Sequence, residues 1–150
     1  MLKSVKSFLC IVIISLVCRH ANSDNWSQFL GPQRNGTSVE KNLIDTWPAS
    51  GPKIVWRTPL GVSMSGVAVV SGAAFTMFQD DTSQCVVCLN AADGKELWRT
   101  PVAPMYENAM GHGPRATPTV ADGHVFAFTG EGILTALKVD DGKQLWSVDV

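Results

Sequence analysis

One nine-residue stretch occurs twice in this chain, and it constrains the fold more than any other feature. Residues 90–98 read Asn-Ala-Ala-Asp-Gly-Lys-Glu-Leu-Trp, and residues 138–146 read Lys-Val-Asp-Asp-Gly-Lys-Gln-Leu-Trp, 48 positions later. A weaker copy at residues 51–56 also ends in Trp. A repeat with a period of about 40–50 residues is typical of propellers and solenoids. The sequence therefore predicts a protein built from repeated structural units.

Short apolar runs alternate with turn signals throughout the repeats. Asp93-Gly94, Asp122-Gly123 and Asp141-Gly142 lie between such runs, and Asp-Gly favours hairpins because both central residues of a tight turn have positive φ. No helical periodicity is evident after residue 54. The strands predicted from this pattern are 54–60, 67–70, 73–79, 86–90, 96–102, 117–120, 124–129, 133–138 and 144–150.

Four short strands in each period of about 45 residues is the spacing of a β-propeller. The predicted fold is all-β, with four-stranded antiparallel blades at about residues 67–102 and 117–150. Residues 54–60 match the outermost strand of a further blade whose other strands have no counterpart upstream. Propellers close with about four to eight blades, so we expect an incomplete propeller. The missing blades would belong to a longer chain, in cis, or to further copies, in trans.

The first 23 residues differ from the rest and predict an export signal. Lys3 and Lys6 precede an apolar run over residues 8–18, and a short polar stretch ends at Ser23. This is the order of a secretory signal, and the run is too short to span a bilayer. We expect a chain exported to the periplasm or cell envelope, and possibly secreted. Residues 24–53 form a polar lead-in in which Trp26 and Trp47 are expected to anchor packing.

Charge and cysteine content limit the classes of partner. Cleavage after residue 23 leaves nine basic residues against 13 acidic ones, a net charge of −4, and nucleic-acid binding needs clustered basic side chains instead. Two cysteines remain, Cys85 and Cys88, three positions apart on a predicted strand. Such positions face opposite sides of a sheet, so two separate buried thiols are favoured over a redox or metal pair.

The repeat resembles the tryptophan-docking motif of PQQ-type β-propellers. Residues 88–98 and 136–146 keep the turn and the closing tryptophan of that motif, namely Gly94, Lys95 and Trp98, and Gly142, Lys143 and Trp146. They depart from it at Cys88, Asn90, Lys138, Asp93 and Asp141. The resemblance implies that each Trp lies flat on the neighbouring blade. A buried indole needs a partner for its N–H, and a backbone carbonyl of the next blade would supply one.

The loop between the two blades is the one candidate binding site. Tyr106, Glu107, Asn108, His112 and Arg115 lie in it, and they include oxygen ligands, a possible base and a cation for anions. The loop is expected over one face of the propeller, near the mouth of its channel. A structured loop whose polar groups satisfy one another is the favoured alternative. No catalytic, cofactor-binding or metal-binding residue is predicted.

The resemblance leaves three functions open. Enzymes of the family hold PQQ and calcium, with a catalytic carboxylate and often two adjacent cysteines, and this chain has no adjacent cysteine pair. It is more similar to the non-enzymatic propellers of outer-membrane assembly, so we expect a scaffold without a cofactor that binds envelope proteins through a propeller face. A PQQ-dependent alcohol or sugar dehydrogenase and a propeller that binds envelope polysaccharide, through Tyr106, are the alternatives.

Overall fold

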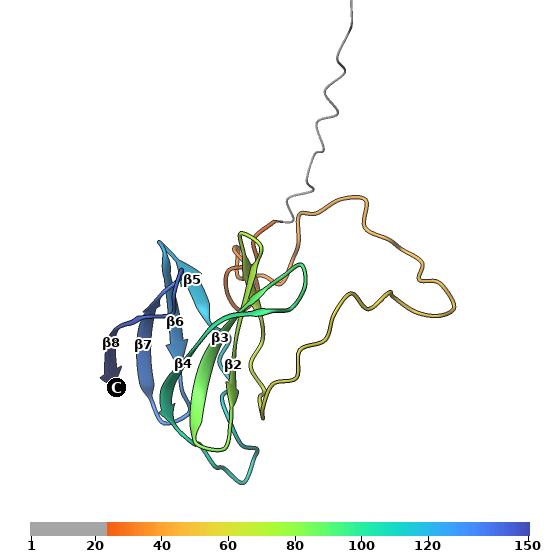
Figure 1. The fold of residues 1–150 in the computed structure, drawn as a ribbon. Coiled ribbons are helices and arrows are strands. Elements are labelled where there is room, and N and C mark those ends of the chain that lie inside the picture. The colour runs from red at the N-terminus through yellow and green to blue at the C-terminus, as the bar shows by residue number, and fades with distance from the viewer. Residues whose placement is uncertain (1–23) are drawn as a thin grey trace, which may run out of the picture.

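A computed structural model describes residues 24–150 and shows two four-stranded antiparallel sheets. The predicted export signal lies outside the described residues. The sheets lie side by side with their faces together (Figure 1). The first contains β1 (Ala68–Val70), β2 (Ala73–Gln79), β3 (Ser83–Asn90) and β4 (Glu96–Pro104), and the second contains β5 (Thr119–Ala121), β6 (His124–Phe128), β7 (Ile133–Lys138) and β8 (Gln144–Asp149).

Both sheets have the strand order of a propeller blade. Neighbours in sequence are neighbours in space, from β1 to β4 and from β5 to β8. The predicted all-β fold of two blades is therefore confirmed. The predicted limits of β2 and β7 are those of the structure, and those of the other six strands differ by one to three residues at either end.

The prediction of a strand at residues 54–60 is wrong, because this segment does not form the hydrogen bonds of a sheet. The structure assigns no strand there, because the inner strands that would pair with it are not among the described residues. The segment nevertheless lies beside the first sheet in the position of an outer strand. The Trp56 indole donates to Ala91 O (2.9 Å), and the Thr58 hydroxyl donates to Gly94 O (2.6 Å).

The Asp-Gly turns are of two kinds. At Asp122-Gly123 both residues have positive φ, 50° and 75°, as predicted for a two-residue hairpin. At Asp93-Gly94 and Asp141-Gly142 only the glycine does, so the prediction of two positive φ values is wrong there. These two turns close four-residue loops, in which Gly94 N donates to Asn90 O (2.8 Å) and Gly142 N to Lys138 O (3.0 Å). Loops of this length are built around a type I turn.

The apolar core is divided between the two faces of the first sheet. One cluster lies between the sheets and contains Phe75, Met77, Cys88 and Trp98 with side chains of the second sheet. The other lies on the opposite face, where Trp56 and Leu60 pack on Phe78, Cys85 and Val87. Cys85 and Cys88 are free, buried and in different clusters, as alternation along a strand requires.

The lead-in joins the inner edges of both sheets. Trp26 exchanges two backbone hydrogen bonds with Val69 of β1 (2.8 and 2.9 Å), and Ser27 O accepts one from Val120 N of β5 (2.8 Å). Trp26 is half-buried, as expected for an anchor, whereas Trp47 is 59% exposed. The rest of the lead-in forms a wide loop beside the first sheet (Figure 1). Among residues 24–150, no helix is long and apolar enough to cross a membrane.

Candidate functional site

The loop that joins the blades lies at the end of the sheets where the β2–β3 and β6–β7 turns also lie (Figure 1). Its backbone closes on itself, with Gly113 N donating to Tyr106 O and Gly111 N to Asn108 O (both 3.0 Å). Met64 N, from the segment before β1, donates to Pro114 O (3.0 Å) and ties the loop to the first blade. The loop is therefore held at both sides by backbone contacts.

Three of the predicted site residues lie together and interact with each other. The Asn108 amide donates to the Tyr106 hydroxyl (3.0 Å), and the Arg115 guanidinium lies 5.6 Å from the centre of the Tyr106 ring. Arg115 also donates to Gly111 O (2.8 Å). A Cβ on Gly130 would lie 2.8 Å from the Tyr106 ring, so this ring packs directly on the second blade and is only partly available for stacking on a sugar.

Three of the predicted site residues are exposed, namely Glu107, His112 and Arg115. Glu107 and His112 line a shallow hollow of about 390 Å³ together with Asn108, Ala109 and Gly111. Within residues 24–150, no group of three or more His, Cys, Asp or Glu side chains is placed to hold a metal ion. What this hollow offers is an exposed acid, an imidazole and an amide, which suits polar contacts with a partner surface.

The docking tryptophans build the contact between successive blades. Trp98 is 9% exposed, and its indole donates to Val139 O in the β7–β8 loop of the second blade (2.9 Å). Thr100 donates to Gly142 O (2.7 Å), and a Cβ on Gly142 would lie 2.4 Å from the Trp98 ring. Gly142 is therefore required twice, for its positive φ of 69° and because the indole lies directly on it.

Trp146 has the same neighbours within its own sheet but no blade to lie on. Phe126, Ala136 and Trp146 are paired across β6, β7 and β8, as Phe75, Cys88 and Trp98 are across β2, β3 and β4. The Phe126 and Trp146 rings are 6.2 Å apart, and those of Phe75 and Trp98 are 6.0 Å apart. Trp146 is 45% exposed, however, and its indole has no hydrogen-bond partner in the described part of the chain.

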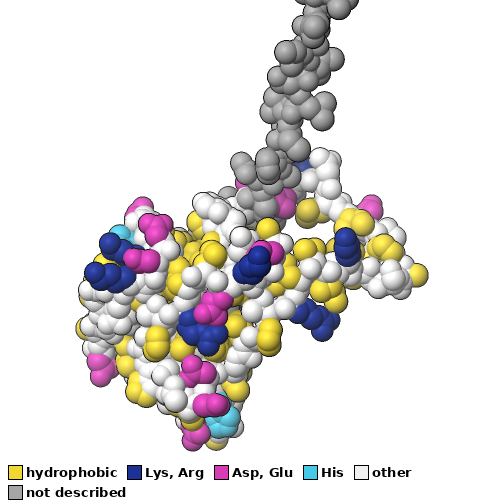
Figure 2. Space-filling model, in the orientation of Figure 1, with side chains coloured by type: hydrophobic (Ala, Val, Ile, Leu, Met, Phe, Trp, Pro, Cys, Tyr) yellow, Lys and Arg dark blue, Asp and Glu magenta, His cyan; other side chains and the backbone are white. Residues whose placement is uncertain are grey.

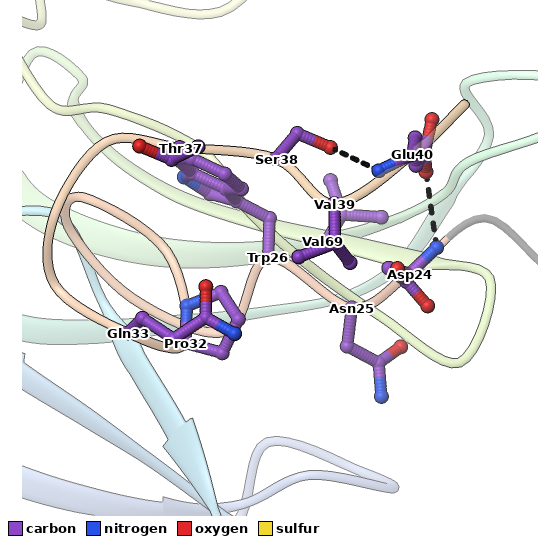
Figure 3. Close-up of a pocket in the computed structure, with 10 residues that line it drawn as sticks. All are labelled: Asp24, Asn25, Trp26, Pro32, Gln33, Thr37, Ser38, Val39, Glu40 and Val69. Atoms are coloured by element: carbon purple, nitrogen blue, oxygen red, sulfur yellow. Dashed lines mark hydrogen bonds between the residues drawn. The ribbon is translucent and has the colours of Figure 1, made fainter. Parts of the chain in front are cut away.

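Two larger hollows lie away from the loop. One, of about 510 Å³, is lined by residues 24–26, 32–33 and 37–40 of the lead-in and by Val69 (Figure 3). The other, of about 520 Å³, opens between the sheets beside Phe75, Cys88 and Trp98. Neither brings together side chains that resemble a catalytic arrangement.

The two buried cysteines have shifted pKa values. Burial raises the pKa of Cys88 to about 11, and burial together with the negative charge of Asp80 raises that of Cys85 to about 11. Both thiols are therefore protonated and unreactive near neutral pH. On the side shown in Figure 2, acidic and basic side chains are interspersed and form no single-sign patch.

Comparison with known proteins gives matches in sequence and in structure. Residues 41–150 match the family described as outer membrane protein assembly factor BamB. The chain is 31% identical to the outer membrane protein assembly factor BamB of Yersinia pestis over an alignment of 134 residues, which covers 81% of this chain and 32% of that protein. It thus spans about a third of the length of the curated relative.

Solved structures give weaker matches. BamB from Moraxella catarrhalis is 18% identical with a TM-score of 0.49, over 64% of this chain and 27% of that one. The quinohemoprotein alcohol dehydrogenase ADHIIG from Pseudomonas putida HK5 is 23% identical with a TM-score of 0.49, over 65% and 15%. TM-scores below 0.5 do not support a structural relationship, so the assignment to a family depends on the sequence matches.

Proposed function

This chain belongs to the family of outer membrane protein assembly factor BamB, and we propose that it is a non-catalytic scaffold that binds proteins in the cell envelope. The observation that carries the proposal is the family match over residues 41–150. Because its relative is described as an outer membrane protein assembly factor, the proposed role is in the assembly of outer-membrane proteins. The proposed location is the periplasm or the periplasmic side of the envelope.

The loop between β4 and β5 is the proposed binding surface. It is held in place by the bonds of Gly113, Gly111 and Met64 described above, so a partner would meet it in a fixed conformation and lose little entropy in ordering it. Exposed Glu107 and His112 would make the polar contacts. Met110, 84% exposed, would supply an adaptable apolar one.

We further propose that the chain acts as part of a longer propeller and needs no cofactor. Two observations support the first part: the chain spans 32% of its relative, and the open side of the second blade carries exposed Phe128 and Trp146. The intact mass of the native product tests it. A mass well above 16.1 kDa supports the longer chain, and a mass of 16.1 kDa, or of 16.1 kDa less the predicted export signal, rejects it.

The scaffold role is tested in a bacterium that carries the gene. Deletion should lower the folded fraction of outer-membrane β-barrel proteins, measured by heat-modifiable mobility on gels, and the unaltered gene should restore it. A Glu107→Ala/His112→Ala variant should restore it poorly, whereas the matched control Lys41→Ala/Asp45→Ala, exposed in the lead-in, should restore it fully. An unchanged folded fraction after deletion would reject the assembly role. Dye reduction by the purified chain with added PQQ and calcium would reject the non-catalytic role.

A further inference from the structure

The lead-in folds back beside β1 and surrounds a hollow that the proposed function leaves unused (Figure 3). The hollow has a volume of about 510 Å³, which is within the range of small-molecule sites in proteins. All ten lining residues lie between positions 24 and 69. The lead-in and β1 therefore form the hollow without a contribution from the second blade.

Backbone contacts fix the shape of this hollow. Trp26 exchanges two hydrogen bonds with Val69 (2.8 and 2.9 Å), and the turn that follows is closed by Gly36 N, which donates to Leu30 O (3.0 Å). Gly31 has a positive φ of 75° and lies against the Trp26 ring, where a Cβ would be 2.7 Å away. A ligand would meet a preformed surface, so little entropy would be lost in ordering it.

The charged groups of the hollow are all acidic. Asp24 and Glu40 are its only charged lining residues, so no lining side chain carries a positive charge. The two residues lie next to each other, because Asp24 N donates to Glu40 Oε1 (3.0 Å). A carboxylate accepts several hydrogen bonds, so this contact is compatible with an ammonium group bound at the same place.

Neutral polar groups and an aromatic ring complete the lining. In Figure 3, Gln33 and Pro32 lie on the side of Trp26 opposite to the two acidic residues. The side chains of Gln33 and Thr37 make no hydrogen bond within residues 24–150, so their polar groups are available to a ligand. The face of an indole carries partial negative charge, which attracts cations and the C–H groups of a sugar ring.

These features together select one class of ligand. An amino sugar offers an ammonium for the carboxylates, hydroxyls for the neutral polar side chains, and a face of C–H groups for the indole. We propose that the hollow binds an amino sugar with a free ammonium group, within a cationic oligosaccharide. A neutral sugar lacks the charge, and a simple amine lacks the hydroxyl groups.

Calorimetric titration of the purified protein with the glucosamine disaccharide tests the proposal. One site per chain is expected, and the N-acetylated disaccharide, which keeps the rings and loses the charge, should bind about fivefold more weakly. Added salt should weaken the binding of the charged disaccharide alone, since both acidic residues are exposed to solvent. Cadaverine, which has two ammonium groups but no hydroxyls, should not bind at the same concentrations.

Glu40→Gln is the most direct variant, because Gln keeps an acceptor for Asp24 N and removes the charge. It should weaken the binding of the glucosamine disaccharide about two- to fivefold and leave that of the N-acetylated form unchanged. Glu107→Gln removes the same charge from the exposed loop between the blades. It is the matched control and should leave the binding of both disaccharides unchanged.

Trp26 provides a test of where the ligand binds. In NMR spectra its indole N–H signal should shift on addition of either disaccharide, whereas the signal of Trp47, 59% exposed in the same lead-in, should not. Trp26→Ala should weaken the binding of both disaccharides roughly five- to tenfold, and Trp47→Ala should leave it unchanged.

The proposal is overturned if no disaccharide binds, if both disaccharides bind equally well, if cadaverine binds as tightly as the charged sugar, or if Glu40→Gln binds it as the unaltered chain does. The site is independent of the proposed assembly role. Failure of the titration leaves that role in place, and failure of the deletion experiment leaves the site in place.

Discussion

In a chain of residues 1–150, Trp98→Ala should destabilise the fold far more than Trp146→Ala, although the two residues occupy equivalent positions of the repeat. Trp98 is 9% exposed, packs on Phe75 and Gly142 and donates to Val139 O, whereas Trp146 is 45% exposed and contacts Phe126 at 6.2 Å. Removing a buried Trp costs about 3–5 kcal/mol of the free energy of unfolding. Removing one aromatic pair at a half-exposed position costs about 1 kcal/mol.

The magnitude for Trp98 has two parts that a second variant separates. Trp98→Phe keeps an aromatic ring beside Phe75 but leaves Val139 O without its donor. A buried carbonyl that loses its partner costs about 1–3 kcal/mol. The remaining loss in Trp98→Ala, about 2 kcal/mol, then measures the cavity and the lost apolar burial.

Urea unfolding followed by far-ultraviolet circular dichroism is the suitable assay, because it does not depend on the tryptophan fluorescence that the variants remove. The midpoint should fall much further for Trp98→Ala than for Trp146→Ala at a similar slope. Thermal midpoints should fall by roughly 10–20 °C and a few degrees, respectively. Equal losses for the two variants would refute the reasoning, since they would mean that Trp98 gains nothing from the neighbouring blade.

Three further outcomes follow from individual residues. Gly142→Ala should lower the free energy of unfolding in urea more than Gly123→Ala. Both glycines have positive φ (69° and 75°), but only at Gly142 would the Cβ meet a ring, at 2.4 Å. We expect losses of about 2–4 kcal/mol and about 1 kcal/mol, respectively, and similar losses would contradict the ring contact. Asp80 accepts hydrogen bonds from Thr82 N and Ser83 N, which lower its pKa from 3.8 to about 2. Because the folded pKa is the lower one, the contribution of Asp80 to stability is present above about pH 4 and lost between pH 4 and 2. Asp80→Asn should therefore weaken the pH dependence of the urea midpoint over that interval, and an unchanged pH dependence would contradict this. Cys85 and Cys88, with pKa values of about 11, should resist alkylation at pH 7.5 in the folded chain and react fully in urea, as measured by peptide mass; rapid labelling of either in the folded chain would contradict their burial.

The strands were predictable because their signals are local. Ser71-Gly72 and Asp122-Gly123 each have two positive φ values and fix hairpins between β-branched or aromatic runs. Within each sheet every strand then pairs with its neighbours in sequence, so no long-range strand pairing had to be inferred. The repeat supplied the rest, because two copies of one motif must have equivalent surroundings within their own sheets.

What the sequence could not give was the difference between equivalent positions. Trp98 and Trp146 end the same motif, and only the three-dimensional arrangement shows that one is covered and the other is open. Residues 54–60 also show that the sequence of a segment does not reveal its neighbours in the fold. Their β-forming pattern predicts a strand, but a strand requires hydrogen-bond partners, and these lie outside the segment itself.

The loop between the blades illustrates why residue type alone is a weak guide to a site. Tyr106, Asn108 and Arg115 were candidates because of their chemistry, and in the structure their polar groups are largely directed at each other and at Gly111 O. Glu107 and His112 are more exposed than Tyr106 and Asn108, and unlike the exposed Arg115 their side chains make no hydrogen bond within residues 24–150. This arrangement depends on how the loop closes through the Gly113 and Pro114 backbone. A partner would therefore distinguish these two residues from the other three, so the Glu107→Ala/His112→Ala variant should weaken binding without loss of stability. Asn108→Ala, which removes the donor to the Tyr106 hydroxyl, should instead lower the free energy of unfolding.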